Sequence, residues 1–400
     1  MTGGRIVIVG AGLAGANTAL ALRERGWRGP LTLLGAEPYR PYDRPPLSKE
    51  VLLGQPAEVD LDIDFEAHDI ELALGRTATR LDVRARRLAT DGGPLDYASV
   101  VLACGAVAVD LPGTAGLPHV HTLRTRDDAE RLRPVLAAAG SLVIVGAGWI
   151  GAEVATAARA AGCAVTVVEA GPHPLAGTLP AEVAERLAAW YAAAGVRLRT
   201  GVAVTAVREG EVELADGTVL GAEAVLVGIG SRPDTDWLAG SGVPLDGSGA
   251  VLADARLATE APGVYAVGDC ASYPSARFGR RLLTHHWQNA LDGAGTVAAT
   301  LLGEPVSHDP VPYFWSRQFG RYLQYAGHHR PDDRLVWRVP DGAQDGPWSV
   351  CWTRDGRLTA VLAVDRPRDL LQGRRLVDRL AEVDPARLAD PDVPLKSAAR

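Results

Sequence analysis

The chain has 400 residues, of which 47% are hydrophobic, so it is long enough for two or three domains with a substantial core. Its formal net charge is −7 and no dense run of Lys and Arg occurs, which argues against nucleic-acid binding. A strand pattern begins almost at the first residue and no uninterrupted apolar stretch reaches membrane-spanning length, so we expect no leader peptide, no membrane association and a cytoplasmic protein.

A strand, a glycine-rich turn and a helix are predicted over residues 5–26. The turn holds Gly10, Gly12 and Gly15 in the spacing GxGxxG. In this pattern the first glycine allows the tight turn, the second lets the backbone approach a pyrophosphate, and the third lets the helix pack against the strand. The next apolar strand ends at Glu37, 22 residues after Gly15, where a carboxylate can accept a hydrogen bond from a ribose hydroxyl. The segment therefore predicts a dinucleotide site with its phosphates at the helix N-terminus.

A rigid cationic segment, PYDRPPLSK, follows at residues 41–49. It contains three prolines together with Arg44 and Lys49. A turn needs only one proline, and proline fixes φ, so this composition predicts a stiff loop that carries two positive charges. A surface loop with incidental charges is the alternative.

The pattern of residues 5–26 recurs over residues 141–162, at a constant offset of 136 residues. The second copy has its own glycine cluster and strand-terminal acid: Gly146, Gly148, Gly151 and Glu169. Each copy continues into an Asp-Gly hairpin signal and a further apolar strand that ends in glycine. The similarity therefore covers about a hundred residues per copy, which predicts two similar α/β nucleotide-binding units.

The surroundings of the second acid indicate which dinucleotides bind. No arginine directly follows Glu169 to receive a 2′-phosphate, and Glu169 would repel one, so NADH is favoured over NADPH at the second site. Two bound NAD molecules would do no chemistry together. We therefore expect the first site to bind FAD, the other common cofactor that contains ADP.

A second part of the FAD site is predicted later in the chain. Residues 259–270 contain an apolar strand that ends in a Gly-Asp pair, and its acid, Asp269, is predicted to bind the flavin ribityl chain, with a helix cap as the alternative. A helix opens near Trp287, and its N-terminus would stabilise negative charge on the flavin pyrimidine. Trp287 is therefore predicted to contact the flavin, with a plain core position as the alternative. His285 and His286 are predicted to be local hydrogen-bonding residues rather than ligands or bases.

The four cysteines, at positions 104, 163, 270 and 351, argue against thiol and metal chemistry. They form neither CxxC nor CxxxxC, and no His/Cys group has metal-ligand spacing. We therefore expect reduced, mostly buried thiols, no bound metal and no disulfide-reductase activity. Cys104 and Cys270 each lie close to an FAD motif, without a second cysteine nearby.

Several motifs together carry a resemblance that covers nearly the whole chain: GAGLAG, PYDRPPLSK, TLRTRDDA, GAGWIGAE, VYAVGD, HWQNA and PYFWSRQFG. The sequence resembles the NADH-dependent ferredoxin reductases of bacterial oxygenase systems, of the putidaredoxin reductase and biphenyl dioxygenase reductase type. The resemblance implies an α/β fold with two Rossmann-like dinucleotide-binding domains, as in glutathione reductase, and a small C-terminal α+β domain. The implied domains are an FAD-binding domain in two parts, 1–109 and 238–308, an NADH-binding domain at 110–237, and a C-terminal reductase domain at 309–400.

The resemblance also implies roles for individual residues. Lys49 would lie beside the N5 edge of the flavin with Glu153 as its partner, and this pair would position the hydride transfer. A buried lysine needs a carboxylate, which agrees with that pairing. Arg44 would face the same anionic cofactor. Further FAD contacts are implied at Ala14, Ala78, Ala103, Arg124 and Trp315. Further NADH contacts are implied at Ile150 and Gly230.

The implied function is the passage of electrons from NADH through FAD to a [2Fe-2S] ferredoxin that serves a cytochrome P450 or a Rieske oxygenase. The alternatives are a redox-regulated assembly or binding protein with little turnover, and an NADH oxidase or rubredoxin reductase-like enzyme. Leu283, His285 and Arg317 depart from the family pattern, which usually has Arg, Glu and an acid there. These departures leave the choice of ferredoxin open.

Two further expectations concern the C-terminal part. Arg317, Arg321 and Arg330 form either a basic patch for an acidic ferredoxin or a solvated face, and the sequence leaves both open. The residues beyond Leu388 are expected to be frayed or loosely docked.

Overall fold

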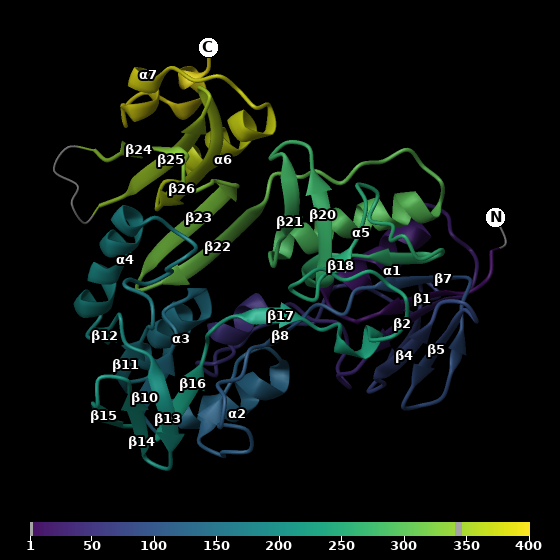
Figure 1. Cartoon of the computed structure of the whole chain (residues 1–400), viewed down its shortest axis with the longest axis horizontal. Helices are drawn as coiled ribbons and strands as arrows, with labels where there is room; N and C mark the ends of the chain where they lie inside the picture. The colour runs from purple at the N-terminus through teal and green to yellow at the C-terminus, as the bar shows by residue number, and fades with distance from the viewer. Residues whose placement is uncertain (1–2, 341–345) are drawn as a thin grey trace.

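The computed structural model describes residues 3–340 and 346–400, which form two similar α/β units and a C-terminal antiparallel sheet (Figure 1). In this view the N-terminal unit lies on the right, the second unit at the lower left and the C-terminal sheet at the upper left. No helix in the described ranges is both long and apolar enough to cross a membrane. The fold class predicted from the sequence is confirmed.

The N-terminal unit is built on a parallel sheet in the order β19-β7-β1-β2-β3. These strands are β1 (Ile6–Val9), β2 (Leu31–Gly35), β3 (Glu71–Leu74), β7 (Ser99–Leu102) and β19 (Val264–Ala266). Along β1, Ile6 and Ile8 pack with the helices, whereas Val7 and Val9 pack with a small antiparallel sheet. The helices are α1 (Leu13–Glu24) and α5 (Trp287–Leu301), and the small sheet is β4 (Ala78–Asp82), β5 (Arg87–Thr90) and β6 (Leu95–Asp96). Because both faces of the parallel sheet are covered, its central strands read as continuous apolar runs.

The second unit repeats this arrangement. Its parallel sheet has the order β12-β11-β10-β16-β9, with a small antiparallel sheet of β13, β14 and β15. The strands are β9 (Val120–His121), β10 (Ser141–Val145), β11 (Ala164–Val168), β12 (Arg197–Arg199), β13 (Val204–Arg208), β14 (Glu211–Leu214), β15 (Val219–Gly221) and β16 (Ala224–Val227). The helices are α2 (Arg126–Ala137), α3 (Trp149–Ala160) and α4 (Ala181–Ala193). β10, β11 and β16 correspond to β1, β2 and β7, so the predicted duplication is confirmed.

Both Asp-Gly hairpin signals also lie where the sequence predicts them. Asp91-Gly92 separates β5 from β6, and Asp216-Gly217 separates β14 from β15. Each pair of strands is antiparallel, as a short Gly-containing loop requires.

The chain crosses between the two units through a two-stranded ribbon. β8 (Ala106–Ala108) leads out of the N-terminal unit, and it pairs antiparallel with β17 (Ser231–Pro233), which leads back (Figure 1). The returning segment then forms a sheet of β18 (Val251–Leu252), β20 (Ala271–Ser275) and β21 (Arg280–Leu283), and it supplies β19 and α5. The N-terminal unit is thus completed by residues that follow the second unit in sequence.

The C-terminal part is an antiparallel sheet in the order β22-β23-β26-β25-β24. Its strands are β22 (Tyr313–Gln318), β23 (Arg321–Gly327), β24 (Arg334–Arg338), β25 (Trp348–Arg354) and β26 (Arg357–Val364), and its helices are α6 (Pro367–Asp378) and α7 (Pro385–Ala389). The β22–β23 turn rests on the second unit: the backbone N–H of Phe319 donates to Thr156 of α3 at 2.9 Å, and its ring lies 4.7 Å from that of Tyr191 on α4.

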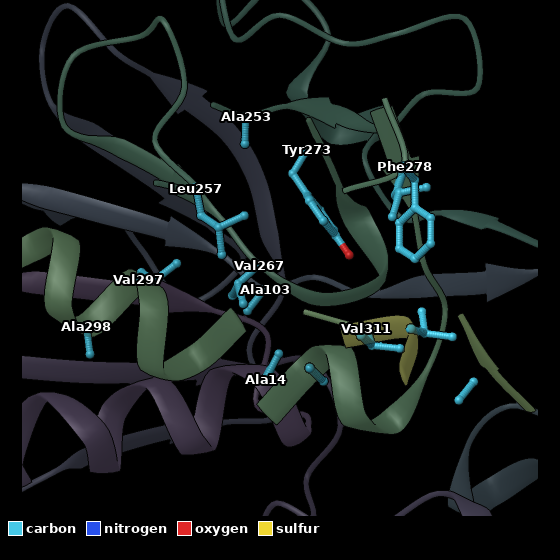
Figure 2. Close-up of a cluster of buried hydrophobic side chains, with 14 of the residues drawn as sticks. Ala14, Ala103, Ala253, Leu257, Val267, Tyr273, Phe278, Val297, Ala298 and Val311 are labelled. Atoms are coloured by element: carbon cyan, nitrogen blue, oxygen red, sulfur yellow. The ribbon is translucent and has the colours of Figure 1, made fainter. Parts of the chain in front are cut away.

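A buried apolar cluster fixes α5 against the rest of the N-terminal unit (Figure 2). Val297 of α5 and Ala14 of α1 belong to this cluster, together with Val267 after β19 and Tyr273 of β20. Val311, just before β22, joins the same cluster. Shared apolar packing therefore holds α5 and the beginning of the C-terminal sheet in fixed places.

The C-terminal tail is firmly bound, so the expectation of a frayed end beyond Leu388 is wrong. Arg338 is 0% exposed, and its guanidinium donates to the backbone carbonyls of Leu388, Asp390 and Val393 at 2.6, 2.8 and 2.7 Å. Asp369 balances this charge, with an Arg338 Nε to Oδ2 distance of 3.2 Å. A buried guanidinium needs several acceptors, and the tail provides them.

His308 gives a prediction about pH. The His308 side chain is buried (3% exposed) between Thr296 and Asn289, and burial lowers its pKa from 6.5 to about 4. The unfolded chain therefore binds more protons than the folded chain between these values, so the stability that the neutral ring contributes is present above pH 6.5 and lost as the pH falls toward 4. We expect this residue alone to remove at most about 1 kcal/mol per pH unit in that window.

Urea unfolding of the wild type and of His308→Gln at pH 7 and pH 5 measures this effect. The variant should lose less stability on acidification than the wild type does. An equal loss in both proteins would contradict the assignment to His308.

Candidate functional site

The glycine turns of both α/β units open into one cavity of about 1420 Å³. The proline loop, the N-terminus of α5 and β22 also contribute to its wall. Small-molecule pockets usually measure about 300–1,000 Å³. This cavity is therefore large enough for an extended dinucleotide and a second nucleotide that meets it.

The first glycine turn fits a pyrophosphate. Gly10 has φ +112°, and a Cβ there would lie 2.1 Å from the Ala103 carbonyl oxygen, so only glycine suits this position. Gly12 is the N-cap of α1, no side chain caps the helix, and a Cβ there would meet nothing within 4 Å. The free N–H groups of the first turn of α1 therefore face open space, as a site for phosphate requires.

The second glycine turn has the same geometry. Gly146 has φ +104°, and a Cβ there would lie 2.4 Å from the Gly228 carbonyl oxygen. At Gly148, the N-cap of α3, the nearest atom to a Cβ would be 3.9 Å away. Gly15 and Gly151 do not line the cavity, and a Cβ there would lie 1.9 and 2.2 Å from the carbonyl oxygens of Gly10 and Gly146. These two glycines act through helix–strand packing rather than at the cavity wall.

The two strand-terminal acids line the cavity, and hydrogen bonds from neighbouring residues fix both carboxylates. Glu37 accepts from Arg44 at 2.8 Å and from the Tyr42 hydroxyl at 2.6 Å. Burial raises the pKa of Tyr42 well above its usual range, so its hydroxyl remains a donor. Glu169 accepts from the backbone N–H groups of Ala147 and Gly171, both at 2.8 Å. Both carboxylates are thereby oriented while keeping lone pairs for a ribose.

Lys49 and Glu153 form an ion pair in the wall of this cavity. Lys49 follows the short 3₁₀ helix η1 (Pro45–Ser48), and its Nζ lies 2.5 Å from Glu153 Oε2 and 3.0 Å from the Pro45 carbonyl oxygen. The side chains are 18% and 6% exposed, and both residues line the cavity. The pairing expected from the resemblance is present, and it joins the proline loop to α3.

Arg124 and Asp269 form a second ion pair in the cavity wall. Arg124 precedes α2, whose N-cap Thr125 forms a capping box with Asp128. The Arg124 guanidinium donates to Asp269 Oδ2 at 2.8 Å, and the Arg124 carbonyl oxygen accepts from Arg44 at 2.6 Å. Arg124, just before α2, therefore links the proline loop to the 3₁₀ turn after β19.

Two tryptophans flank the cavity from different parts of the chain. Trp287 is the first residue of α5, as predicted, and its Nε1 donates to Asp43 at 2.8 Å. Trp315 of β22 packs edge-on against Trp287, with ring centroids 5.8 Å apart. The other predicted residues that line the cavity are Ala14, Ala78, Ala103, Ile150 and Gly230. Ile150 is 41% exposed, as suits a contact for a bound nucleotide.

A family model described as pyridine nucleotide-disulphide oxidoreductase matches residues 4–294, well over half of the chain. The chain belongs to this family. A second family model, described as reductase C-terminal, matches residues 313–399 of this pyridine nucleotide-disulphide oxidoreductase. The family resemblance predicted from the motifs is confirmed.

Relatives similar over their whole length are reductase components. The p-cumate 2,3-dioxygenase system ferredoxin–NAD(+) reductase component of Pseudomonas putida is 38% identical, covering 99% of this chain and 98% of the relative. The structure of the covalent putidaredoxin reductase–putidaredoxin complex matches with a TM-score of 0.94 and 32% identity, over 99% of this chain and 98% of that chain. The ferredoxin reductase for the CYP199A2 system from Rhodopseudomonas palustris matches with a TM-score of 0.92 and 34% identity, over 99% and 100%.

In this pyridine nucleotide-disulphide oxidoreductase, two cysteines that are distant in sequence lie together. Contact with the Cys270 thiol, together with burial, raises the pKa of Cys104 well above its usual range. Sequence reasoning treated each as solitary because 166 residues separate them. All four cysteines are free, and in the described ranges no cluster of three or more His, Cys, Asp or Glu side chains could hold a metal ion.

The three residues that depart from the family pattern lie in two different places. Leu283 and His285 line the cavity, and Ser231 lies 3.0 Å from Nδ1 of His285. Burial lowers the pKa of His285, which keeps this ring neutral near pH 7. Arg317 is exposed outside the cavity, with its guanidinium 5.4 Å from the Tyr322 ring centroid.

The three arginines of the suggested basic patch do not gather in one place. Arg317 and Arg321 lie at the β22–β23 turn, whereas Arg330 follows the other end of β23. Arg321 stacks on Trp190 of α4 at 4.9 Å, and Arg330 donates to the Phe278 carbonyl oxygen at 2.9 Å. Each of the three guanidinium groups therefore has its own partner within the chain.

Proposed function

We propose that this protein is an NADH-dependent ferredoxin reductase that passes electrons from NADH through FAD to a [2Fe-2S] ferredoxin. One observation carries the proposal: both dinucleotide turns open into a single cavity, and the Lys49–Glu153 ion pair lines that same cavity. FAD in the first site would accept a hydride from NADH and release electrons singly, which is chemistry that the cofactor supplies.

The residues of the chain bind and orient the two cofactors. Free N–H groups at the starts of α1 and α3 hold the pyrophosphates, and Glu37 and Glu169 hold the riboses. Asp269, fixed by Arg124, is the residue for the ribityl hydroxyls, and Trp287 and Trp315 cover the ring system. The Lys49 ammonium, held by Glu153, fixes the geometry at the point where the two cofactors meet.

The partner assignment rests on the relatives. Their names describe ferredoxin reductases of dioxygenase systems and of a CYP system, and one solved structure is a complex with a putidaredoxin. The electron acceptor of this protein is therefore a ferredoxin that serves a cytochrome P450 or a Rieske oxygenase. The proposal includes a cytoplasmic location and the use of NADH rather than NADPH.

Cytochrome c reduction tests the function. The FAD-loaded protein is assayed with NADH or NADPH, with and without an added [2Fe-2S] ferredoxin. Strong stimulation by ferredoxin with NADH preferred supports the proposal. Rapid NADH oxidation by O₂ alone would instead indicate an NADH oxidase, and no flavin reduction by either nucleotide would indicate a binding or assembly role.

Replacing Lys49 by alanine should keep FAD bound and slow its reduction. The variant removes the ammonium that Glu153 holds at the junction of the two sites, so we expect reduction by NADH to fall about tenfold to a hundredfold. Anaerobic stopped-flow spectroscopy of flavin bleaching measures the rate. Lys49→Arg serves as the charge control, and an unchanged rate in Lys49→Ala would remove the proposed role.

A further inference from the structure

Glu153 is the meeting point of three segments of the chain. Its Oε2 accepts from Lys49 and from the Ser48 hydroxyl, both at 2.5 Å. Its Oε1 accepts from the Ser316 hydroxyl at 2.7 Å. The first two donors belong to the proline loop, whereas Ser316 belongs to β22 of the C-terminal sheet. A carboxylate that is only 6% exposed needs hydrogen-bond donors such as these to satisfy its oxygens and fix its orientation.

The direction of the Ser316 hydrogen bond is set from within the C-terminal sheet. Ser316 and Gln318 are 1% and 2% exposed and alternate with Trp315 and Arg317 along β22. The Gln318 side-chain nitrogen lies 3.4 Å from the Ser316 hydroxyl oxygen, so it donates to this oxygen. The hydroxyl proton is then free to point at Glu153.

The backbone around Ser316 is held close to α3. Just beyond Gln318, the Phe319 N–H donates to Thr156, about one helical turn beyond Glu153 on α3. β22 therefore approaches α3 at two successive turns, with the Ser316 hydroxyl aimed at a fixed carboxylate. The opposite face of the same strand carries Trp315, which lines the cavity, and the exposed Arg317.

The lysine itself is an unusual choice in this chain. Of 41 basic residues of the Lys and Arg types, only Lys49 and Lys396 are lysines. Arginine carries a wide planar fork, whereas lysine is a compact point charge on a flexible stem. A flexible ammonium needs its acceptor to be fixed if it is to occupy one place.

We propose that Ser316 is a positioning residue for flavin reduction: it fixes Glu153, and Glu153 in turn fixes Lys49. This inference rests on the proposed function and extends it, because it makes the C-terminal sheet a contributor to the NADH half of the reaction. One face of β22 presents Trp315 and Arg317, and its other face contacts Glu153 through Ser316. A shift of β22 would therefore change the position of Lys49 and with it the rate of flavin reduction.

A matched pair of serine substitutions tests the proposal. Ser316→Ala removes the donor to Glu153. Ser349→Ala is the control. Ser349 is 0% exposed in the same sheet, and its hydroxyl donates to another carboxylate, that of Asp369, at 2.7 Å. Neither residue lines the cavity. Ser316→Thr keeps a hydroxyl at the site and should restore wild-type behaviour.

Acetylation with acetic anhydride, followed by mass spectrometry, reads out the lysine directly. Lys396 is exposed and is an internal reference for Lys49 in every sample. In FAD-loaded protein, Ser316→Ala should raise the acetylation of Lys49 relative to Lys396 severalfold, and Ser349→Ala should not. Anaerobic reduction by NADH should slow about tenfold in Ser316→Ala, the effect of losing one hydrogen bond to a charged group, with FAD content unchanged.

The outcomes separate this inference from the proposed function. If Ser316→Ala matches Ser349→Ala in labelling, or if labelling rises without slower reduction, the positioning role of Ser316 is overturned. If NADH does not reduce the wild type at all, the proposed function fails. In that case the labelling contrast by itself decides whether Ser316 holds Lys49 through Glu153.

Discussion

Gly12→Ala should yield a folded protein that is purified without FAD, whereas Gly148→Ala should keep its FAD and bind NADH poorly. Both glycines are helix N-caps with almost the same backbone angles, φ −82° and ψ −170° against φ −78° and ψ −171°. An added methyl group would clash with no protein atom at either position, so we expect each change to alter stability by no more than about 1 kcal/mol.

The expected losses of affinity come from steric conflict between the added methyl group and the bound cofactor. A methyl group in the space where a pyrophosphate must approach would break several hydrogen bonds to charged oxygens, worth about 1.5–3 kcal/mol each. Affinity should therefore fall about a hundredfold or more. FAD content is measured from the absorbance of flavin released on unfolding. The NADH affinity of Gly148→Ala is measured from the concentration dependence of anaerobic flavin reduction, and loss of FAD from both variants would contradict the assignment of the two sites.

Arg338→Met should strongly destabilise the C-terminal part of the protein. The fully buried guanidinium neutralises Asp369 and binds the carbonyl groups of the C-terminal tail, and methionine replaces none of these contacts. Removing one partner of a buried ion pair costs about 3–5 kcal/mol. Hydrogen–deuterium exchange of residues 384–400 over a urea series measures this loss in the C-terminal part.

Arg357→Met is the matched control for that change. Arg357 pairs with Glu382 at 2.8 Å, yet the two side chains are 48% and 56% exposed. An exposed ion pair contributes about 0–1 kcal/mol, so this variant should change stability little. If the two variants lost equal stability, the tail would not depend on the buried charge.

The features that sequence predicted well are those that local backbone geometry dictates. Gly10 must have positive φ, Gly15 must sit against a carbonyl oxygen, and Glu37 must end a strand, so their spacing identifies a dinucleotide unit without any tertiary information. The same constraints recur at Gly146 and Gly151. The start of α5 at Trp287 followed from the same kind of pattern, whereas the position of the proline loop at the cavity was implied by the family resemblance.

The features that sequence missed depend on contacts between distant segments. Ser316 and Glu153 are 163 residues apart, and nothing near either residue indicates the other. Cys104 and Cys270 meet because β7 and β19 are neighbours in the sheet. The tail beyond Leu388 looks polar and proline-rich, and only the buried Arg338 shows why it is ordered.

The return of the chain to the N-terminal sheet has a consequence for biosynthesis. A nascent protein usually completes its domains in the order in which the ribosome makes them. Here β19 pairs with β7, and α5 packs beside α1, but both are made only after the whole second unit has been translated. The second unit is contiguous from β9 to β16 and can close its own sheet first. The N-terminal strands must therefore wait, with an open edge at β7, until residues near 264 emerge from the ribosome.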